Sequence, residues 1–372
     1  RYHFAHCPSR YLFFRPESSR SSVGVFHTQH KIIRSLTLMR EQVIHLKGLN
    51  GIRAMAAIGV VISHISVTLN AFFPWFQTNP VHFGNGMADF GVTMFFTLSG
   101  FLITYLLLCE KAVSRVNIRN FYVRRILRIW PLYYGYLLVS LVVIYFFGLY
   151  DEPYNYLFYI LMIGNAGYAL HIVPIPLLSH LWTIGVEEQF YLFWPYLVRK
   201  AKHELVAFAI FLAGFILIKL VLRYLLFRYG DGASVQYAMV YLARFDCMAI
   251  GAIGAYCYFN RPSTLISLMS LPAIQFLAWL CLALIALNRF YVTDFVNHDL
   301  VATVTLCVII GQINGACGPV NLDNRLCDFL GRISYGIYVI HPLIMLTYFR
   351  LADEYGADGL MFGLVSYPVI IL

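Results

Sequence analysis

The strongest constraint on this chain is a series of long apolar runs separated by short polar segments. A helix needs about 20 predominantly apolar residues to cross the hydrocarbon core of a bilayer. Only 12% of the 372 residues are charged, against about 25% in soluble domains. Runs of the required kind occur at about 52–72, 88–108, 131–149, 181–198, 205–226, 237–259, 268–287, 299–313, 332–350 and 359–372. We therefore expect an all-α, polytopic membrane helix bundle with about ten transmembrane helices.

A further apolar stretch at 155–165 is shorter, and glycines and prolines follow it closely. Its path can be predicted from loop charge, because short loops rich in Lys and Arg stay on the cytoplasmic side. If this stretch crossed the membrane, the basic cluster at 199–202 would lie outside, opposite the basic cluster at 111–128. We therefore expect a re-entrant or external segment near 150–180, with both termini on the cytoplasmic side.

The ends of the chain differ in character from its middle. Residues 1–38 are rich in Arg, Ser, His and Phe, and we expect a disordered extension or a start-site artefact, with translation beginning at Met39. Residues 39–372 show no internal repeat and no low-complexity linker, so we expect one membrane domain. Leu372 lies inside an apolar run, so this domain either ends there or is truncated.

Charge and cysteine content bear on partners and metals. The net charge of +9 could indicate nucleic-acid binding, but much of the basic excess flanks apolar runs, as in membrane proteins. We expect membrane lipids, and no nucleic acid, as partners. The eight Cys show no CxxC pair and no metal-ligand spacing, and most lie in or beside apolar runs, where Cys acts as a small hydrophobic residue. We expect neither disulfides nor a bound metal.

The first apolar run contains two polar side chains, Arg53 and His64. Eleven helical residues bring the second side chain back to within about 20° of the first, about 16 Å further along the axis. An ionisable residue inside a membrane span is expensive unless it faces protein or water, and it marks a functional site by default. We interpret His64 as a catalytic candidate; the alternative is a histidine whose hydrogen bonds are satisfied by a neighbouring helix.

A second polar group opens the run at 181–198. Glu187 lies about 10 Å below the start of a helix that begins near 180, and Tyr191 shares its face at i,i+4. We expect His64 at a similar depth, and a carboxylate close to an imidazole raises its basicity and fixes its tautomer, as general-base catalysis requires. Glu187 is therefore the predicted partner of His64; a purely structural hydrogen bond or ion pair is the alternative.

Three arginines lie within five residues just before the run at 131–149. Arg125 and Arg128 are neighbours at i,i+3, and Arg124 and Arg128 at i,i+4. Guanidinium groups match phosphate oxygens in geometry and charge, so we predict a phosphate site on the cytoplasmic side. The alternative is that these residues only mark the cytoplasmic end of a span.

Other polar residues in apolar runs admit structural explanations. Ser99, followed by Gly100, allows close helix packing, which explains the pair as well as chemistry does. Ser334, Tyr338 and His341 share one helix face, and we expect Arg244 and Asp246 to form a buried pair or to cap the bundle. We interpret both of the latter groups as more structural than catalytic.

These motifs together resemble acyltransferase family 3, a family of integral-membrane O-acyltransferases, over nearly all of 46–372. Arg53 and His64 are similar to the Arg-x10-His signature of the family, whose His is regarded as essential. Arg125 and Arg128 are similar to its Arg-x-x-Arg motif. Further segments that resemble family motifs are 95–103, 182–191, with Glu187 in the place of the family glutamate, and 334–341.

One departure from the family concerns the second apolar run. Many members have Asp where this chain has Thr93, so any role of that Asp is in doubt here. Asp89, four residues earlier, is not an obvious substitute.

The resemblance implies acyl transfer from a cytoplasmic acyl-CoA, most often acetyl-CoA, as donor substrate. The CoA phosphates would bind Arg125 and Arg128 with Arg53 nearby, and His64 would take the acceptor proton or briefly carry the acyl group. Ser99, Tyr191 and His341 would contact substrate or support the site. The acceptor would be a hydroxyl of a cell-envelope or exported carbohydrate, or of a lipid-linked glycan. The membrane would be a bacterial inner membrane, although animal and fungal members exist.

A transporter or exporter of a small or lipid-linked substrate is the competing class. Buried polar groups in a many-span bundle also occur in proton relays and substrate pathways. Neither repeat symmetry nor paired broken helices are visible in the sequence, and the basic cluster lies at the predicted cytoplasmic mouth. These features favour an enzyme, while a structural membrane scaffold is a further alternative.

Overall fold

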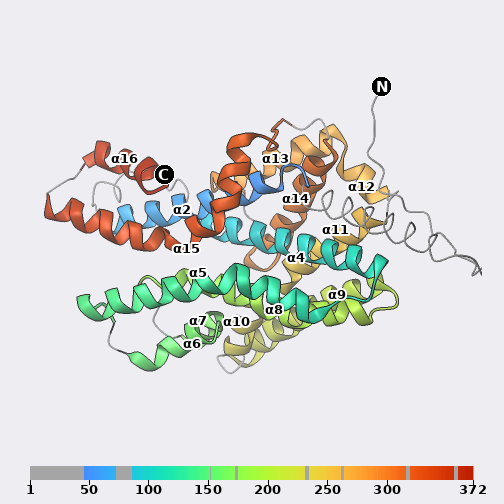
Figure 1. Cartoon of the computed structure of the whole chain (residues 1–372), viewed down its shortest axis with the longest axis horizontal. Coiled ribbons are helices and arrows are strands. Elements are labelled where there is room, and N and C mark those ends of the chain that lie inside the picture. The colour runs from blue at the N-terminus through green and yellow to red at the C-terminus, as the bar shows by residue number, and fades with distance from the viewer. Residues whose placement is uncertain are drawn as a thin grey trace, which may run out of the picture.

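The structure is a computed structural model, and it describes residues 46–72, 86–150, 152–171, 175–230, 234–260, 264–290, 292–315, 319–355 and 359–371. The predicted extension over 1–38 and the start at Met39 lie outside these residues. Within them the chain is helical and contains no strand, which confirms the all-α class (Figure 1). The helices are α2 (Leu49–Phe72), α4 (Met87–Val113), α5 (Ile118–Phe147), η1 (Pro153–Asn155), α6 (Tyr156–Ile160), α7 (Gly164–Ala169), η2 (Ser179–Leu181), α8 (Trp182–Lys200), α9 (Glu204–Tyr229), α10 (Ser234–Ala243), α11 (Phe245–Phe259), α12 (Thr264–Met269), α13 (Pro272–Ala286), α14 (Asp294–Asn314), α15 (Arg325–Glu354) and α16 (Gly359–Ile371).

Seven helical segments in the described part of the chain are long and apolar enough to cross a membrane. They are α2, α4, α5, α9, α10 together with α11, α14 and α15. The other three predicted runs are helical as well, in α8, α13 and α16, over 19, 15 and 13 residues. The protein is therefore a polytopic membrane helix bundle.

The segment between α5 and α8 contains no helix longer than six residues among those described. It packs along α8 through two glycines. A Cβ on Gly164 would lie 3.2 Å from the Cα of Trp182, and one on Gly185 would lie 2.4 Å from the carbonyl oxygen of Met162. The prediction that this stretch does not form a further span is thus confirmed for the described residues.

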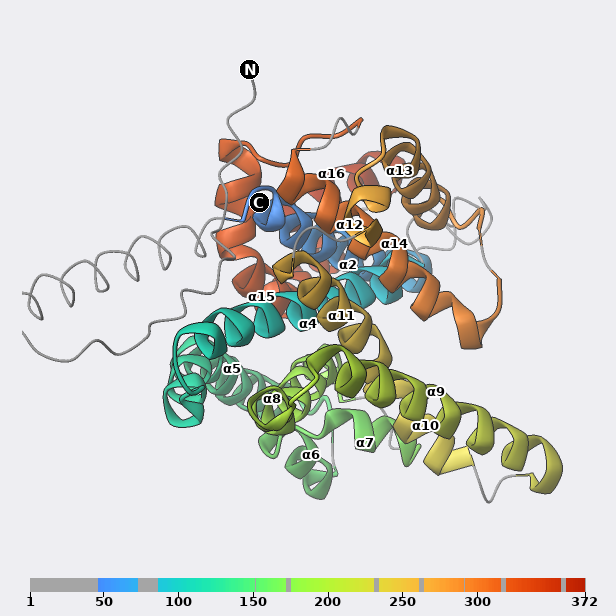
Figure 2. The ribbon, with the colours of Figure 1, turned by 90° about the vertical axis from the view of Figure 1, so that its right-hand side faces the viewer.

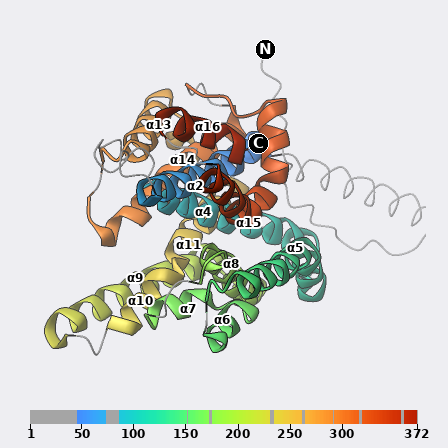
Figure 3. The same ribbon diagram turned by 90° about the vertical axis from the view of Figure 1, so that its left-hand side faces the viewer.

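Helices α4 and α11 lie at the centre of the bundle. In Figure 1, α2 and α12–α16 lie above them and α5–α10 below, and Figures 2 and 3 show the same division from the two sides. The two central helices cross in direct backbone contact, because a Cβ on Gly100 would lie 2.0 Å from the carbonyl oxygen of Met248, and one on Gly251 would lie 2.0 Å from that of Thr97. This confirms the predicted close approach at Ser99-Gly100.

The apolar run at 237–259 is divided between α10 and α11 by Arg244. This residue has φ +47° and ψ +33°, in the left-handed region that non-glycine residues rarely adopt. Its side chain is almost fully buried, and its guanidinium carbon lies 5.4 Å from the ring centre of Trp182. Contacts of the Arg244 side chain thus stabilise the helix break between α10 and α11, in the middle of a predicted span.

Candidate functional site: an arginine-lined cavity and a histidine chain

A cavity of about 340 Å³ lies between α2, α4, α5, α8 and α15. Its wall contains six of the residues that the sequence predicts for the site: Arg53, Ser99, Arg125, Arg128, Glu187 and Tyr191. Most of the remaining wall is apolar or aromatic, with Ser334 and Tyr338 contributed by α15. Residues from five helices, some of them far apart in the sequence, thus form one site.

Three guanidinium groups give this cavity its positive charge. Arg53, on the first turns of α2, donates from Nη1 to Oδ1 of Asn50 at 3.0 Å. Arg125 lies 5.8 Å from the ring centre of Tyr191, and its buried Nε has no hydrogen-bond partner among the described residues. No ion pair joins Arg53, Arg125 or Arg128 to a described carboxylate. Because three cations without carboxylate partners line one cavity, the site is suited to an anion that carries several oxygens.

Arg124, the third arginine of the predicted cluster, lies elsewhere. Its Nη2 is 3.5 Å from Oε2 of Glu110, and more than half of its side chain is exposed. It is absent from the cavity wall. Of the three arginines that the i,i+3 and i,i+4 spacing placed together, Arg125 and Arg128 thus line the cavity and Arg124 does not.

Glu187 forms the acidic part of the cavity wall. Its Oε1 accepts a hydrogen bond from the Ser99 hydroxyl at 2.5 Å, and its Oε2 accepts one from the Tyr191 hydroxyl at 3.4 Å. Glu188 points away, and its Oε2 accepts a hydrogen bond from Nε1 of Trp130 at 3.2 Å. The prediction that Glu187 and Tyr191 share a face is therefore confirmed.

His64 belongs to a separate group of rings. Its Nδ1 lies 2.7 Å from Nε2 of His341 on α15, and the two ring centres are 5.0 Å apart. His180, just before α8, packs edge-on against His341 with ring centres 5.2 Å apart. His341 and His180 are buried, whereas His64 is half-buried. The histidine of the first span therefore has a histidine partner from the late helix.

The predicted contact between His64 and Glu187 is wrong. Glu187 bonds to Ser99 and Tyr191, and His64 bonds to His341. The reason is the path of the chain before α8. Because this segment turns back into the bundle, His180 lies beside His341 at the depth of His64, so Glu187, seven residues on, lies about 10 Å deeper.

The cavity and the histidines are separated by aromatic rings. His64 is not part of the cavity wall, whereas Tyr338 and Phe95 are, and their ring centres lie 5.9 Å apart. On its other side, the Tyr338 ring lies 5.9 Å from the ring of His341. Tyr338 is fixed by its hydroxyl, which lies 2.6 Å from Oγ1 of Thr183 and donates to the His180 carbonyl oxygen at 2.7 Å.

A second polar cluster joins α9, α11 and α14. Lys219 is 2% exposed and forms a very short ion pair with Asp246, and its Nζ lies 3.8 Å from Oδ2 of Asp299. Lys219 was not among the predicted site residues, although it is a cation in the middle of the run at 205–226. A charge inside a membrane span needs a partner, as for His64, so the position of Lys219 in this run is the signal that predicts it.

The predicted pair of Arg244 with Asp246 is also wrong, because both residues have other partners. Arg244 donates from Nη2 to Oδ1 of Asp89 at 3.1 Å, and its Nη1 lies 3.4 Å from Oγ1 of Thr93. The carboxylate of Asp89 and the hydroxyl of Thr93 therefore contact the same guanidinium group. From the sequence alone, Asp89 was not expected to replace the acidic residue that many family members have at position 93.

One group of side chains in the described part of the chain has the spacing of a metal site. The ligand atoms of Asp246, Cys247 and Asp299 lie within 4.8 Å of one another. The Lys219 ammonium group, however, already bonds to Asp246 and lies close to Asp299. It thus takes the place that a metal cation would need, and the charges of this cluster are better explained as an ion-pair network.

Comparison with known proteins relates the chain to O-acetyltransferases. The chain is 26% identical over 330 residues to the peptidoglycan O-acetyltransferase OatA of Listeria monocytogenes, covering 82% of this chain and 50% of that protein. It is 28% identical over 344 residues to the putative peptidoglycan O-acetyltransferase YrhL of Bacillus subtilis, covering 82% and 49%. A putative O-acetyltransferase of Staphylococcus aureus is 25% identical, with 85% and 52% covered.

The chain spans about half the length of these curated relatives. No solved structure matches it. The family described as "Acyltransferase domain" matches residues 46–372, a range that includes every residue of the cavity and of the histidine group. The chain therefore belongs to this acyltransferase family.

Proposed function

We propose that this protein is a membrane-bound O-acyltransferase. It moves an acyl group, most often acetyl, from cytoplasmic acyl-CoA to a hydroxyl of a cell-envelope or exported carbohydrate. The observation that carries the proposal is the cavity, in which Arg53, Arg125 and Arg128 lack carboxylate partners among the described residues. The names of the relatives, peptidoglycan O-acetyltransferases among them, support acetyl transfer to a carbohydrate.

The donor phosphates bind the three guanidinium groups. Phosphate oxygens accept paired, charge-assisted hydrogen bonds from guanidinium groups, which are stronger than the bonds that a neutral ligand can form. The apolar and aromatic remainder of the wall suits the pantetheine arm. About 16 Å separates the levels of Arg53 and His64 along α2, a distance that an extended pantetheine arm can bridge.

The thioester meets the acceptor hydroxyl near His64, and for this the Phe95 ring moves away from the ring of Tyr338, which its hydroxyl bonds hold in place. Nε2 of His64 takes the hydroxyl proton as the acceptor oxygen attacks the thioester carbonyl carbon. The new C–O bond forms, the C–S bond breaks, and the thiolate of CoA leaves and receives the proton. Positioned acid–base help of this kind contributes about 10²–10⁴ in rate.

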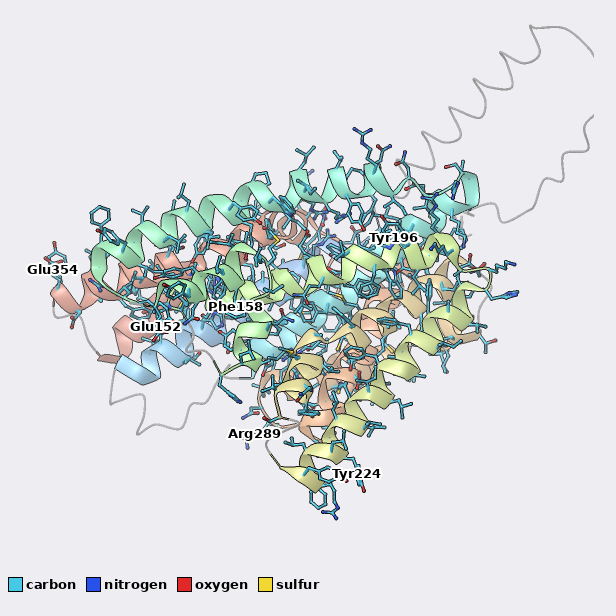
Figure 4. All side chains as sticks on the ribbon, turned by 90° about the horizontal axis from the view of Figure 1, so that it is seen from below. Glu152, Phe158, Tyr196, Tyr224, Arg289 and Glu354 are labelled. Atoms are coloured by element: carbon cyan, nitrogen blue, oxygen red, sulfur yellow. The ribbon has the colours of Figure 1, made fainter. Side chains whose placement is uncertain are left out.

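The end of the bundle at which α2 begins and α4 ends faces the cytoplasm. Basic residues gather in the segments at this end, at 111–128 and 199–202, and positive loops stay inside. Figure 4 shows Glu152 and Glu354 together at the opposite end of the molecule. The donor thus enters the arginine-lined cavity from the cytoplasm and the acceptor approaches from the other side, in the membrane of a bacterial cell.

Release of CoA thiol by the purified full chain tests this function. With acetyl-CoA and a peptidoglycan-derived oligosaccharide, we expect thiol release and an alkali-labile ester on the sugar. The variant His64→Gln should lose both, with a loss of at least about 10², and should still bind acetyl-CoA. Since a transporter cleaves no thioester, absence of thiol release from an acetyl-CoA-binding wild type would overturn the proposal.

A further inference from the structure

The hydrogen bonds around His341 identify the tautomer of His64. Nδ1 of His341 lies 2.7 Å from the backbone carbonyl oxygen of Tyr338. A carbonyl oxygen can only accept, so this nitrogen carries a proton and donates it. The ring is almost fully buried, at 1% exposure, and no described carboxylate bonds to it, so a charged ring would be unpaired in a buried site. His341 is therefore neutral, and its Nε2 is an acceptor.

The acceptor atom Nε2 of His341 also determines which nitrogen of His64 carries the proton. Nδ1 of His64 lies 2.7 Å from Nε2 of His341, so the proton between the two rings belongs to Nδ1 of His64. A neutral His64 then has its lone pair on Nε2. No described residue bonds to this atom, and the ring is half-buried. The basic nitrogen is thus the one to which no described residue bonds.

We propose that His341 is the positioning residue of the acyl transfer, which holds His64 with Nδ1 protonated and Nε2 as the reactive nitrogen. This rests on the proposed function for its catalytic consequence, although the tautomer itself does not. When Nε2 takes a proton, the cationic charge on His64 is stabilised by the donor–acceptor chain that runs through His341 to the Tyr338 carbonyl. Outer partners of this kind set the tautomer and orientation of reactive histidines.

Two amide variants of His341 differ in one relevant property. A Gln amide reaches as far from Cβ as Nε2 of His does, so its oxygen can accept from Nδ1–H of His64. An Asn amide reaches only as far as Nδ1 of His and leaves His64 without an acceptor. We expect His341→Asn to lower kcat by about 10²-fold and His341→Gln to stay within about tenfold of the wild type, with KM for acetyl-CoA unchanged in both.

His180 provides the matched control for ring packing. The His180 ring contacts His341 edge-on, but its Nε2 bonds to the backbone carbonyl oxygen of Val339 at 3.0 Å. His180 is therefore not part of the hydrogen bonds that connect His64, His341 and the Tyr338 carbonyl oxygen. We expect His180→Phe to keep kcat within about threefold of the wild type. Equal kcat for the Asn and Gln variants of His341, or a loss in His180→Phe as large as in His341→Asn, would overturn the proposal.

A spectroscopic measurement tests the tautomer apart from catalysis. In ¹⁵N-histidine-labelled protein, the signals lost in His64→Gln identify His64, and we expect a protonated Nδ1 and a bare Nε2. If the wild type releases no CoA thiol but shows this tautomer, the proposed function fails and the assignment of the ring stands. If His64 carries its proton on Nε2, the role of His341 is refuted even in an active enzyme.

Discussion

The arginine-lined cavity and the Lys219 cluster are both charged and both lie among membrane helices, but they differ in pairing. Lys219 bonds to Asp246 with Asp299 close by, and it lines no part of the cavity. Arg53, Arg125 and Arg128 share a cavity wall and have no described carboxylate partner. A buried charge whose partners are all protein serves the fold, whereas cations that line a cavity can bind a ligand.

The largest effect should come from removing charge at the cavity. Each charge-assisted hydrogen bond contributes about 1.5–3 kcal/mol, so Arg125→Gln with Arg128→Gln should raise KM for acetyl-CoA by at least about 10²-fold. Thiol release over a range of acetyl-CoA concentrations measures this. Arg124→Gln is the control, because this arginine faces Glu110 and should leave KM unchanged. An unchanged KM in the double variant would contradict the donor site.

Removal of Lys219 should act on the fold instead. Lys219→Met leaves Asp246 as a buried charge without its cation, and breaking such a pair costs about 3–5 kcal/mol. Unfolding in detergent should show this loss, while KM for acetyl-CoA stays the same in the folded fraction.

The second variant, Lys219→Met with Asp246→Leu, replaces both charges with apolar side chains and should recover part of the lost stability. If Lys219→Met changed the KM for acetyl-CoA without lowering stability, the Lys219 cluster would take part in donor binding, and its proposed difference from the arginine-lined cavity would be contradicted.

A smaller effect is expected at the Ser99–Glu187 hydrogen bond. Ser99→Ala removes the donor of a 2.5 Å bond to a buried carboxylate, which costs about 1–3 kcal/mol and should lower kcat/KM by about 10–100-fold. Ser334→Ala is the matched control, because Ser334 lines the same cavity but bonds to the Gly331 carbonyl oxygen of its own helix. If both variants lose activity equally, Ser99 acts only by filling space.

The smallest effect should be that of Tyr191→Phe. The hydroxyl bond to Glu187 is 3.4 Å long and therefore weak. The phenyl ring keeps its place beside Arg125, and a cation–π contact of this kind contributes about 0.5–1 kcal/mol. We expect kcat/KM within about threefold of the wild type. A loss like that of Ser99→Ala would place the hydroxyl, and not the ring, in the reaction.

The helices and six of the residues that line the cavity could be predicted from the sequence, because the apolar runs and the spacing of the polar residues within them follow local periodicity. Spacing placed Arg125 and Arg128 on one helix face, and the structure puts both into one cavity with Arg53. The partner of His64 could not be predicted in this way. His341 lies 277 residues further along the chain, and no local pattern states that α15 packs beside α2.

The failure at Glu187 has a different physical cause. The predicted depth of Glu187 assumes that α8 begins at the outer end of a full span. In the structure, His180 lies just before α8 and beside His341, which bonds to His64, so α8 begins near the level of His64 and Glu187 lies about 10 Å further along the axis. The pairing of Arg244 failed because the break at its left-handed backbone turns Arg244 and Asp246 toward different neighbours.

The close backbone approach of α4 and α11 at Gly100 and Gly251 has a consequence for how this wall can evolve. Ser99 faces the cavity, while its neighbour Gly100 meets the backbone of α11. A methyl group at position 100 or 251 would push the two central helices apart, because it would fall on a carbonyl oxygen that cannot yield. A shift of α4 would then move the Ser99 hydroxyl relative to Glu187 on α8. Adaptation to longer acyl groups is therefore open to residues that line the cavity, such as Phe95, and closed to the glycines behind them.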